Sequence, residues 1–231
     1  MTETETTDRR LAKPGSAAGA GDDATARLSI GGATASQGSG ATVRLRRDRR
    51  RQTLLDAAAS AFAENGFERT SMDEVASRAG VTRLIVYRHF ESKDDLCRAV
   101  VERAAEGVAR SVGEHLADGP TVGGAVVGYL FAARVDPDGF RLLARRSDLE
   151  GNLARYRERF EKAAVKVADD ILARRVSDPV MRSWVAGTLV ALLEDATLSW
   201  LDTGDPSRDR EMTSALTRSI QAMLESFSHG R

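Results

Sequence analysis

Two short helices joined by a glycine turn restrict the fold of this sequence more than any other feature. Ser71, followed three residues later by Glu74, has the residue types of a capping box that opens a helix. Gly80 can end that helix, because glycine adopts the left-handed backbone that a tight turn between helices needs. Thr82 can then cap a second helix. The pattern predicts a helix–turn–helix unit over roughly residues 71–90.

The rest of the chain also has helical patterns. Ahead of the unit, apolar residues recur at helical spacing; they are Leu54, Leu55, Ala58, Ala61 and Phe62. Ser92, followed by acidic residues, predicts the start of a longer helix from about Lys93 to Leu116. About five further helices follow between Gly, Pro and Asp breakers, and no segment shows the alternation of a strand. The predicted fold class is all-α.

Composition divides the chain into three parts. Residues 1–43 are rich in Gly, Ala, Ser and Thr, which predicts a disordered tail. Residues 44–108 hold the helix–turn–helix unit in an N-terminal three-helix domain, and residues 109–231 form a second helical domain. The sequence has no secretion signal pattern and no run of ~20 apolar residues that would span a bilayer. We therefore expect a cytoplasmic protein with no membrane partner.

Positive charge is concentrated around the helix–turn–helix unit. The whole chain has 34 basic and 34 acidic residues, so its net charge does not attract nucleic acid. Residues 44–51, however, read RLRRDRRR, and residues 44–93 contain eleven basic and seven acidic side chains, a local charge of +4. The arginine run fits a solvated helix start and an arm on the DNA backbone or minor groove about equally well.

The outer face of the second short helix suits DNA contact. Val86 and Phe90, four residues apart, should face the core, and the outward positions are then Arg83, Leu84, Tyr87 and Arg88. Arginine can form two hydrogen bonds with a guanine edge, and tyrosine and arginine reach phosphate oxygens. Because the second helix of such a unit enters the major groove, the pattern predicts double-stranded DNA as the partner.

The same stretch carries a pattern of small and apolar residues at fixed spacing. It comprises Ala57-Phe62, Gly66-Phe67, Thr70-Ser71, Val75-Ala76, Ala79-Gly80-Val81-Thr82, Val86-Tyr87, His89-Phe90, Ser92-Lys93 and Leu96, about a quarter of the chain. This pattern resembles the DNA-binding region of the TetR family. The resemblance implies a dimeric, ligand-responsive repressor on a pseudo-palindromic operator. The DNA contacts that we expect are Thr82, Arg83, Tyr87, His89 and Lys93, joined by Ser71, Leu84 and Arg88.

Leu84 departs from the family pattern, in which a small residue lets the helix approach the bases. A leucine can instead pack on a thymine methyl group. Two alternatives therefore stay open: a three-helix bundle with no DNA role, and a dimeric small-molecule sensor or scaffold whose DNA-binding face is degenerate. An enzyme would need a catalytic motif. His-Glu-x-x-His, Gly-x-Ser-x-Gly and the dinucleotide fingerprint are all missing, so no catalytic residue is predicted.

The resemblance also implies a C-terminal domain that binds an effector and forms the dimer. Candidate pocket residues are Tyr129, Phe131, Phe140, Leu143, Tyr156 and Phe160, although aromatic side chains at this spacing also fit an ordinary core. Two terminal helices, about residues 180–201 and 207–227, can form a four-helix bundle with a second copy or complete a monomer core. Candidate interface residues are Trp184, Leu189, Leu192, Trp200, Leu216, Ile220 and Met223.

Other residue types point to no further chemistry. Cys97 is the single cysteine, and its helical surroundings favour a small packing residue over a redox switch. The three histidines are scattered, so neither a metal nor another cofactor is predicted. The arginines of the middle helices fit solvated surface charge or an anionic effector; they are Arg134, Arg141, Arg145 and Arg146.

Overall fold

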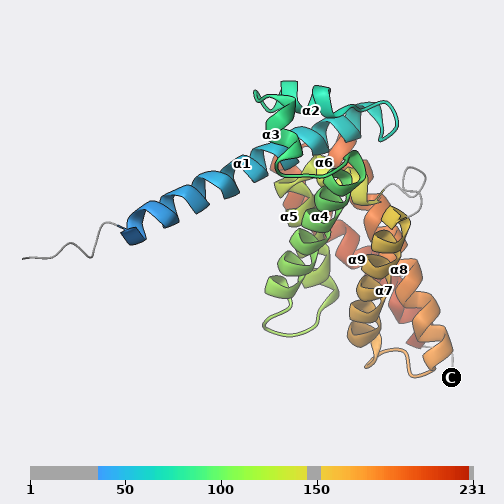
Figure 1. Cartoon of the computed structure of the whole chain (residues 1–231). Helices are drawn as coiled ribbons and strands as arrows, with labels where there is room; N and C mark the ends of the chain where they lie inside the picture. The colour runs from blue at the N-terminus through green and yellow to red at the C-terminus, as the bar shows by residue number, and fades with distance from the viewer. Residues whose placement is uncertain (1–35, 145–151, 229–231) are drawn as a thin grey trace, which may run out of the picture. The chain divides into compact units, whose positions relative to one another are not determined.

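The computed structural model describes residues 36–144 and 152–228, and these residues are almost entirely helical (Figure 1). They contain no strand, which confirms the all-α fold class. The helices are α1 Ser36–Asn65, α2 Met72–Arg78, α3 Arg83–Tyr87, α4 Lys93–His115, α5 Val122–Val135, α6 Pro137–Ala144, α7 Asn152–Leu172, α8 Pro179–Thr203, the 3-10 helix η1 Pro206–Arg208 and α9 Asp209–Ser228.

The predicted helix starts are formed by side-chain caps. The Ser71 hydroxyl accepts a hydrogen bond from the Glu74 amide at 3.1 Å, and the Ser92 hydroxyl accepts one from the Asp95 amide at 3.0 Å. Glu74 differs from the capping-box prediction, because its carboxylate accepts hydrogen bonds from Asn65 and Arg78. This carboxylate therefore ties the start of α2 to the end of α1.

The first helix is longer than the sequence predicts. Residues 1–35 of the predicted tail lie outside the described residues, whereas residues 36–43 form the first turns of α1. Side chains from Val43 to Thr53 are exposed, including the whole arginine run. These arginines are thus carried on a helix, and not on an extended arm.

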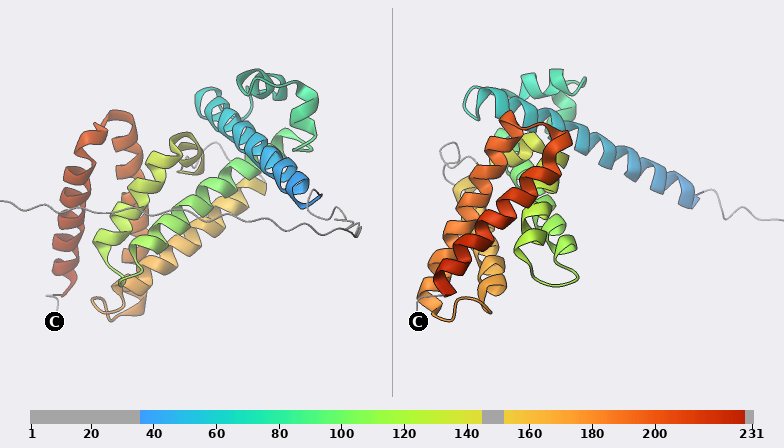
Figure 2. Two further views of the ribbon diagram at one scale, coloured as in Figure 1. Left: turned by 90° about the vertical axis from the view of Figure 1, so that its left-hand side faces the viewer. Right: turned by 180° about the vertical axis from the view of Figure 1, so that it is seen from behind.

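Residues 42–231 form one compact unit in which α4 is the central element. It packs against α5, α6 and α7, while α8 packs on α7 and α5, and α9 packs on α5 (Figure 2). The predicted domain boundary at 108/109 falls within α4. The helix–turn–helix part and the C-terminal part consequently share one helix. In the described part of the chain, no helix is long and apolar enough to span a membrane.

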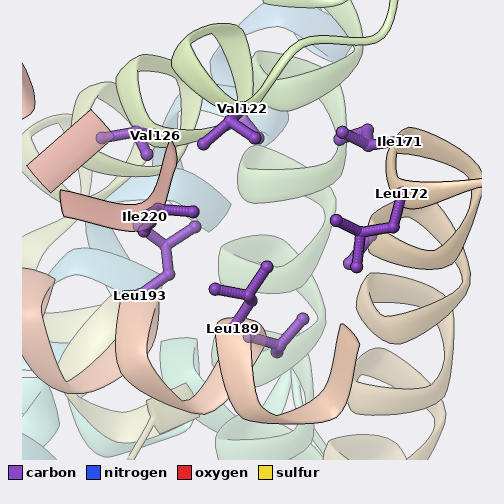
Figure 3. A pocket seen from close by; sticks show the side chains of 10 residues that line it. Val122, Val126, Ile171, Leu172, Leu189, Leu193 and Ile220 are labelled. Carbon is purple, nitrogen blue, oxygen red and sulfur yellow. The ribbon is translucent and has the colours of Figure 1, made fainter. Parts of the chain in front are cut away.

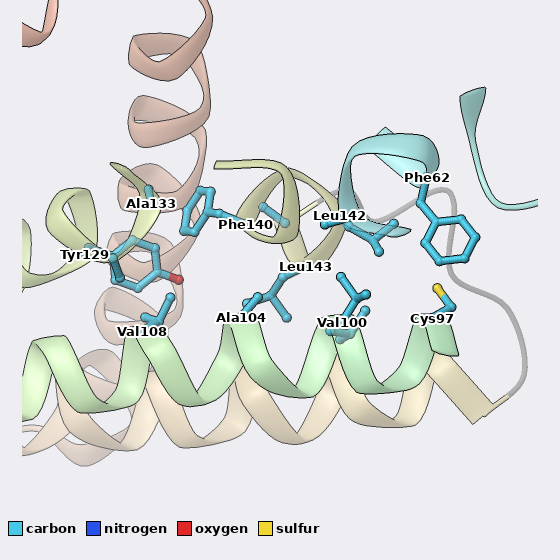
Figure 4. Packing of buried hydrophobic residues seen from close by; sticks show 14 of the residues in the cluster. Phe62, Cys97, Val100, Ala104, Val108, Tyr129, Ala133, Phe140, Leu142 and Leu143 are labelled. Atoms are coloured by element: carbon cyan, nitrogen blue, oxygen red, sulfur yellow. The ribbon is translucent and has the colours of Figure 1, made fainter. Parts of the chain in front are cut away.

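The hydrophobic core is also continuous along α4. Figure 4 shows Phe62 of α1 above Cys97 at one end of α4 and Tyr129 of α5 above Val108 towards the other, with Leu142 of α6 between them. Burial raises the pKa of the Cys97 thiol to about 12, so this cysteine is an unreactive packing residue, as its surroundings in the sequence favoured.

The glycines of α5 allow this helix to approach α4 closely. A Cβ at Gly128 would lie 2.8 Å from the Val112 Cα and 2.9 Å from the Ser111 carbonyl oxygen. Both atoms belong to the backbone of α4, so neither can move aside without shifting the helix. The glycine-rich segment of α5 is therefore a helix-packing surface.

We predict that Gly128→Ala destabilises the protein by about 1–3 kcal/mol, because the added methyl group overpacks the α4–α5 contact. Gly113→Ala in α4 is the matched control, since a Cβ there meets nothing within 4 Å. The control should raise stability by up to ~1 kcal/mol through helix propensity. Chemical denaturation at one fixed protein concentration measures both changes. A Gly128→Ala variant as stable as the control would contradict the close approach.

Candidate DNA-binding surface and ligand cavities

Helix α3 packs its inner face on the core and exposes its outer face to solvent. Gly80 has φ of +63°, and the Val81 amide donates to the Ala76 carbonyl at 3.0 Å, which closes the turn between α2 and α3. Val86 and Phe90 are buried in the core, as their spacing predicts. The four outward positions are all exposed: Arg83, Leu84, Tyr87 and Arg88. This geometry is that of a helix–turn–helix unit with a free recognition face.

Arg83 is held by two neighbours on this face. Its guanidinium forms a 2.7 Å ion pair with Asp73 of α2 and donates to the Tyr87 hydroxyl at 3.3 Å. Both members of the ion pair are more than half exposed, so water screens the pair and it contributes little to stability. The Asp73 contact thus orients Arg83 while leaving it available. Sequence reasoning missed Asp73, because nothing in the spacing places α2 and α3 side chains together.

The remaining predicted contacts occupy different environments. Thr82 stands at the N-cap of α3, but its hydroxyl makes no capping hydrogen bond, whereas the Ser71 hydroxyl is used as a cap. Leu84 is 62% exposed and points away from the core. Lys93 donates to the carbonyls of Phe67 and Glu68 at 2.9 and 3.2 Å. An ammonium has three protons, so Lys93 fixes this loop and retains one donor for a phosphate.

The arginine run reaches the end of the recognition unit. The Arg51 guanidinium lies 5.3 Å from the centre of the Phe90 ring. The pKa of His89 is lowered, first by burial and then by the nearby charges of Arg47, Arg51 and Arg50. These effects place the positive charge of α1 beside the C-terminal end of α3, where it extends the basic face.

Comparison with known proteins agrees with this geometry. Residues 54–100 match the family model for bacterial regulatory proteins of the tetR family. The chain is 30% identical over 200 residues to the HTH-type transcriptional activator FasR of Mycolicibacterium smegmatis, covering 80% of this chain and 86% of FasR. The chain belongs to the tetR family. It is accordingly a DNA-binding transcriptional regulator and not an enzyme.

Solved structures of other proteins share the fold over about three quarters of this chain. A TetR-like regulator from Rhodococcus sp. RHA1 has a TM-score of 0.65 at 19% identity, covering 79% of this chain and 97% of that one. AibR, solved in complex with isovaleryl coenzyme A and operator DNA, has a TM-score of 0.59 at 16% identity, covering 74% and 97%. At these identities the likeness extends to the fold alone.

Two cavities bear on ligand binding: one lies within the predicted ligand-binding part, residues 109–231, and the other extends from it into residues 44–108. An apolar slot of about 50 Å³ lies between α5, α7, α8 and α9; Figure 3 shows Val126, Leu189 and Ile220 on its walls. A larger cleft, of about 440 Å³, is bordered by α1, α4, α5 and α6. We call it the Arg103 cleft, after the arginine that joins its walls.

The predicted pocket residues do not gather in one cavity. Phe131 and Phe140 line the Arg103 cleft. Tyr129 and Leu143 are buried in the core, while Tyr156 and Phe160 of α7 pack partly buried against it. The slot has an entirely aliphatic lining, and therefore an aromatic pattern could not have found it.

A buried polar cluster lies in the same core. The Arg157 guanidinium donates to Glu194 at 2.5 Å and to the Leu143 carbonyl at 2.9 Å, and Tyr129 donates to Glu194 at 3.2 Å. All three side chains are buried, and desolvation with the negative charge of Glu194 raises the pKa of Tyr129. The cluster connects α5, α6, α7 and α8. Sequence reasoning missed it, because Arg157 and Glu194 look like surface residues of amphipathic helices.

The candidate interface residues divide among three environments: exposed, buried and partly buried. Trp184 and Leu192 are exposed, whereas Leu189 and Ile220 are buried beside the slot. Leu216 and Met223 are partly buried, and the Trp200 indole donates to Asp209 at 2.6 Å across the turn before α9. The Trp184 ring contacts Phe227 of α9 at 6.3 Å between ring centres.

The middle-helix arginines are used in ion pairs where the structure describes them. Arg134 bonds Asp209 through two nitrogens, at 2.8 and 3.0 Å. Arg141 contacts Asp202 at 2.9 Å and Asp138 at 3.2 Å. Arg145 and Arg146 lie outside the described residues. Arg134 and Arg141 are thus part-buried and ion-paired, which differs from solvated surface charge and leaves both guanidinium groups already engaged by carboxylates.

We predict that Arg83→Ala relaxes base preference at one position of the operator and costs about 1–3 kcal/mol at the preferred base. Tyr87→Ala should instead weaken binding to all duplexes about equally, because a phosphate contact carries no sequence information. Titrations of single-base operator variants distinguish the two. An equal loss on every operator variant for Arg83→Ala would contradict its role as the base-reading residue.

We also predict that, in the protein without DNA, the pKa of His89 lies below the usual histidine value of about 6.5. As pH falls, His89 therefore takes up a proton in the unfolded protein before it does so in the folded protein. Folding stability consequently decreases as pH falls through about 6.5 towards the folded pKa of His89. Substituting Arg47 and Arg50 with Gln should raise the pKa only in part, since burial remains. NMR titration of the imidazole follows both proteins, and an unchanged pKa in the variant would place the arginines away from His89.

Proposed function

We propose that the protein is a dimeric, sequence-specific DNA-binding regulator whose operator affinity is changed by a small molecule. The observation that carries the proposal is the exposed face of α3, where Arg83, Tyr87 and Arg88 stand over a fully packed base. A solvated bundle gains nothing from holding a half-exposed tyrosine beside a paired arginine. A major-groove reader needs both.

The C-terminal helices supply the second element of the proposal. Val180, Met181, Trp184 and Leu192 give α8 an exposed apolar face beside α9. Two such pairs of helices can form an isologous four-helix interface. A dimer built in this way would place its two recognition helices in successive major grooves, ~34–36 Å apart, on a pseudo-palindromic operator.

Effector control would follow from the helix shared by both parts. A ligand shifts DNA affinity only if it binds the two conformations unequally. Because α4 carries one face of the core from Cys97 to Val108, a change in the packing of α5 or α6 is transmitted along it to α1 and α3. AibR was solved in complex with both isovaleryl coenzyme A and operator DNA, which supports a joint function of this kind.

Repression is the simplest outcome when an operator overlaps a promoter, and we propose it for this regulator. FasR is named an activator, so the same fold serves both outcomes. Run-off transcription on the selected operator decides between repression and activation.

The degenerate-sensor alternative is favoured by Leu84 alone, because a bulky side chain at that position changes the approach of α3 to the bases.

The test is a binding selection on random duplex DNA with the full chain, sequenced after several rounds and repeated at two salt concentrations. We expect enrichment of an inverted repeat, with affinity falling as salt rises because phosphate contacts release counterions. A folded protein that enriches no motif would overturn the proposal in favour of the degenerate sensor.

A matched pair of variants tests the dimer within the same experiment. Trp184→Asp puts a charge on the proposed α8 interface, whereas Val167→Asp puts one at a solvent-exposed position on α7. Sedimentation should show monomers only for Trp184→Asp, and this variant should bind the inverted repeat at least tenfold more weakly than Val167→Asp, a difference of ~1.4 kcal/mol. Equal dimerisation of both would exclude this face as the interface.

A further inference from the structure

The Arg103 cleft has the size of a small-molecule site. Its volume is about 440 Å³, within the range of roughly 300–1,000 Å³ that ligand pockets occupy. The slot near Leu189 holds about 50 Å³, little more than one or two water molecules. Of these two cavities in the described residues, the cleft is the one that can accept a ligand without rearrangement of the core.

The cleft combines an apolar floor with an exposed aromatic rim. Ala104 and Val108 of α4 and Phe140 of α6 form buried floor positions, and Figure 4 shows them facing one another. At the rim, Phe131 is 55% exposed and Val135 is 66% exposed, one turn apart on α5. Large apolar side chains left this open beside a cleft provide area for the body of a ligand.

A buried hydroxyl in the cleft lacks a hydrogen-bond partner. Ser111 lines the cleft and is 5% exposed, and within the described residues its Oγ bonds to nothing. Its carbonyl is already bonded to the His115 Nδ1 at 2.8 Å. Buried polar groups are almost always paired. A ligand donor or acceptor that reaches this hydroxyl would satisfy it.

The charges around the cleft favour a cation. Its lining contains four carboxylates against two arginines, a net charge of −2. Arg103 is already bound to Asp56 at 2.6 Å and to Asp136 at 2.9 Å. The other charged side chains of the lining, Glu106, Arg110 and Glu114, follow one another at four-residue spacing on α4, are exposed, and form no ion pair within the described residues. Their net charge of −1 leaves this rim, next to Ser111, negative.

We propose that the Arg103 cleft binds a small organic cation with an apolar, ring-bearing body. The ammonium lies beside Glu114, one helical turn from Ser111, and donates to the Ser111 hydroxyl, while the body packs on Phe131 and the floor. A ring or ammonium beside Phe131 also gains from the aromatic face. Binding requires only the cleft, whereas any effect of the cation on DNA affinity rests on the proposed function.

The cleft also explains how such a ligand would act. One wall of the cleft contains Gln52 and Asp56 of α1, the helix that leads into the DNA-binding part of the chain. The opposite wall belongs to α5. Arg103 bridges the two walls through Asp56 and Asp136. A ligand whose body packs between these two walls changes how they lie against each other and so changes the attachment of α1.

The experiment compares two probes with one body and opposite charge. Calorimetric titration of the DNA-free full chain uses 3,3-diphenylpropylamine and 4,4-diphenylbutanoate. We expect saturable binding of the amine, at least tenfold tighter than binding of the carboxylate. Equal binding of the two probes, or no binding of the amine, would overturn the proposal.

Three variants locate the binding in the cleft. Glu106→Gln with Glu114→Gln should weaken amine binding at least tenfold, and Ser111→Ala should weaken it severalfold with folding intact, since the hydroxyl has no partner to lose. Glu158→Gln is the matched control on α7, outside the cleft, and should bind as the parent does. Unchanged binding by the double variant would overturn the site.

DNA binding separates this proposal from the previous one. If the amine binds but random selection enriches no operator, the cleft stands and the proposed function fails. If an operator is enriched but the amine does not bind, the proposed function stands and the cleft proposal fails. With both in place, saturating amine should change operator affinity severalfold, and the double variant should lose that response.

Discussion

The apolar face of α4 is the constraint on which the rest of this structure depends. Cys97 packs under Phe62 of α1, and Val100, Ala104 and Val108 continue the same face under α6 and α5. Each fully buried valine or leucine of this kind contributes roughly 1.5–3 kcal/mol. Because close-packed interiors do not deform continuously, a helix that serves two packing partners at once couples their positions. The recognition helix therefore stands on the same packed unit as the ligand cavities.

The buried cluster around Glu194 has a different purpose from that apolar face. An ion pair removed from water is often no more stable than well-packed apolar side chains of the same volume. Its geometry is nevertheless directional, and breaking it leaves a buried charge. The hydrogen bonds of Arg157 to Glu194 and to the Leu143 carbonyl fix α7 against α8 and α6 in a single register. An aliphatic slot next to it can then stay open without the helices sliding together.

Sequence patterns predicted the local elements of this fold well and its long-range contacts poorly. Ser71, Gly80 and Ser92 act through neighbours within three or four residues, so their capping and turn chemistry can be recognised without the fold. The same holds for Val86 and Phe90, whose spacing alone assigns them to the core. By contrast, Asp73 meets Arg83 across a turn, and Arg157 meets Glu194 37 positions away. Such pairs depend on how helices pack, which charged residues on amphipathic helices do not reveal.

The same distinction explains why aromatic residues were poor guides to the cavities. Tyr129 and Phe140 pack edge to face at 5.6 Å and fill the core, while the aliphatic side chains around them leave space. The feature that makes the Arg103 cleft a control point is the polar bridge of Arg103 to Asp56 and Asp136. Asp136 caps α6 through the Gly139 amide at 3.0 Å and also receives Arg103, whose other branch reaches Asp56. Charge-assisted hydrogen bonds contribute about 1.5–3 kcal/mol each when partly buried. Coupling between two sites in a regulator is typically ~1–3 kcal/mol. Loss or gain of one bond of this bridge is therefore of the magnitude that effector control requires, and the core itself need not be remodelled.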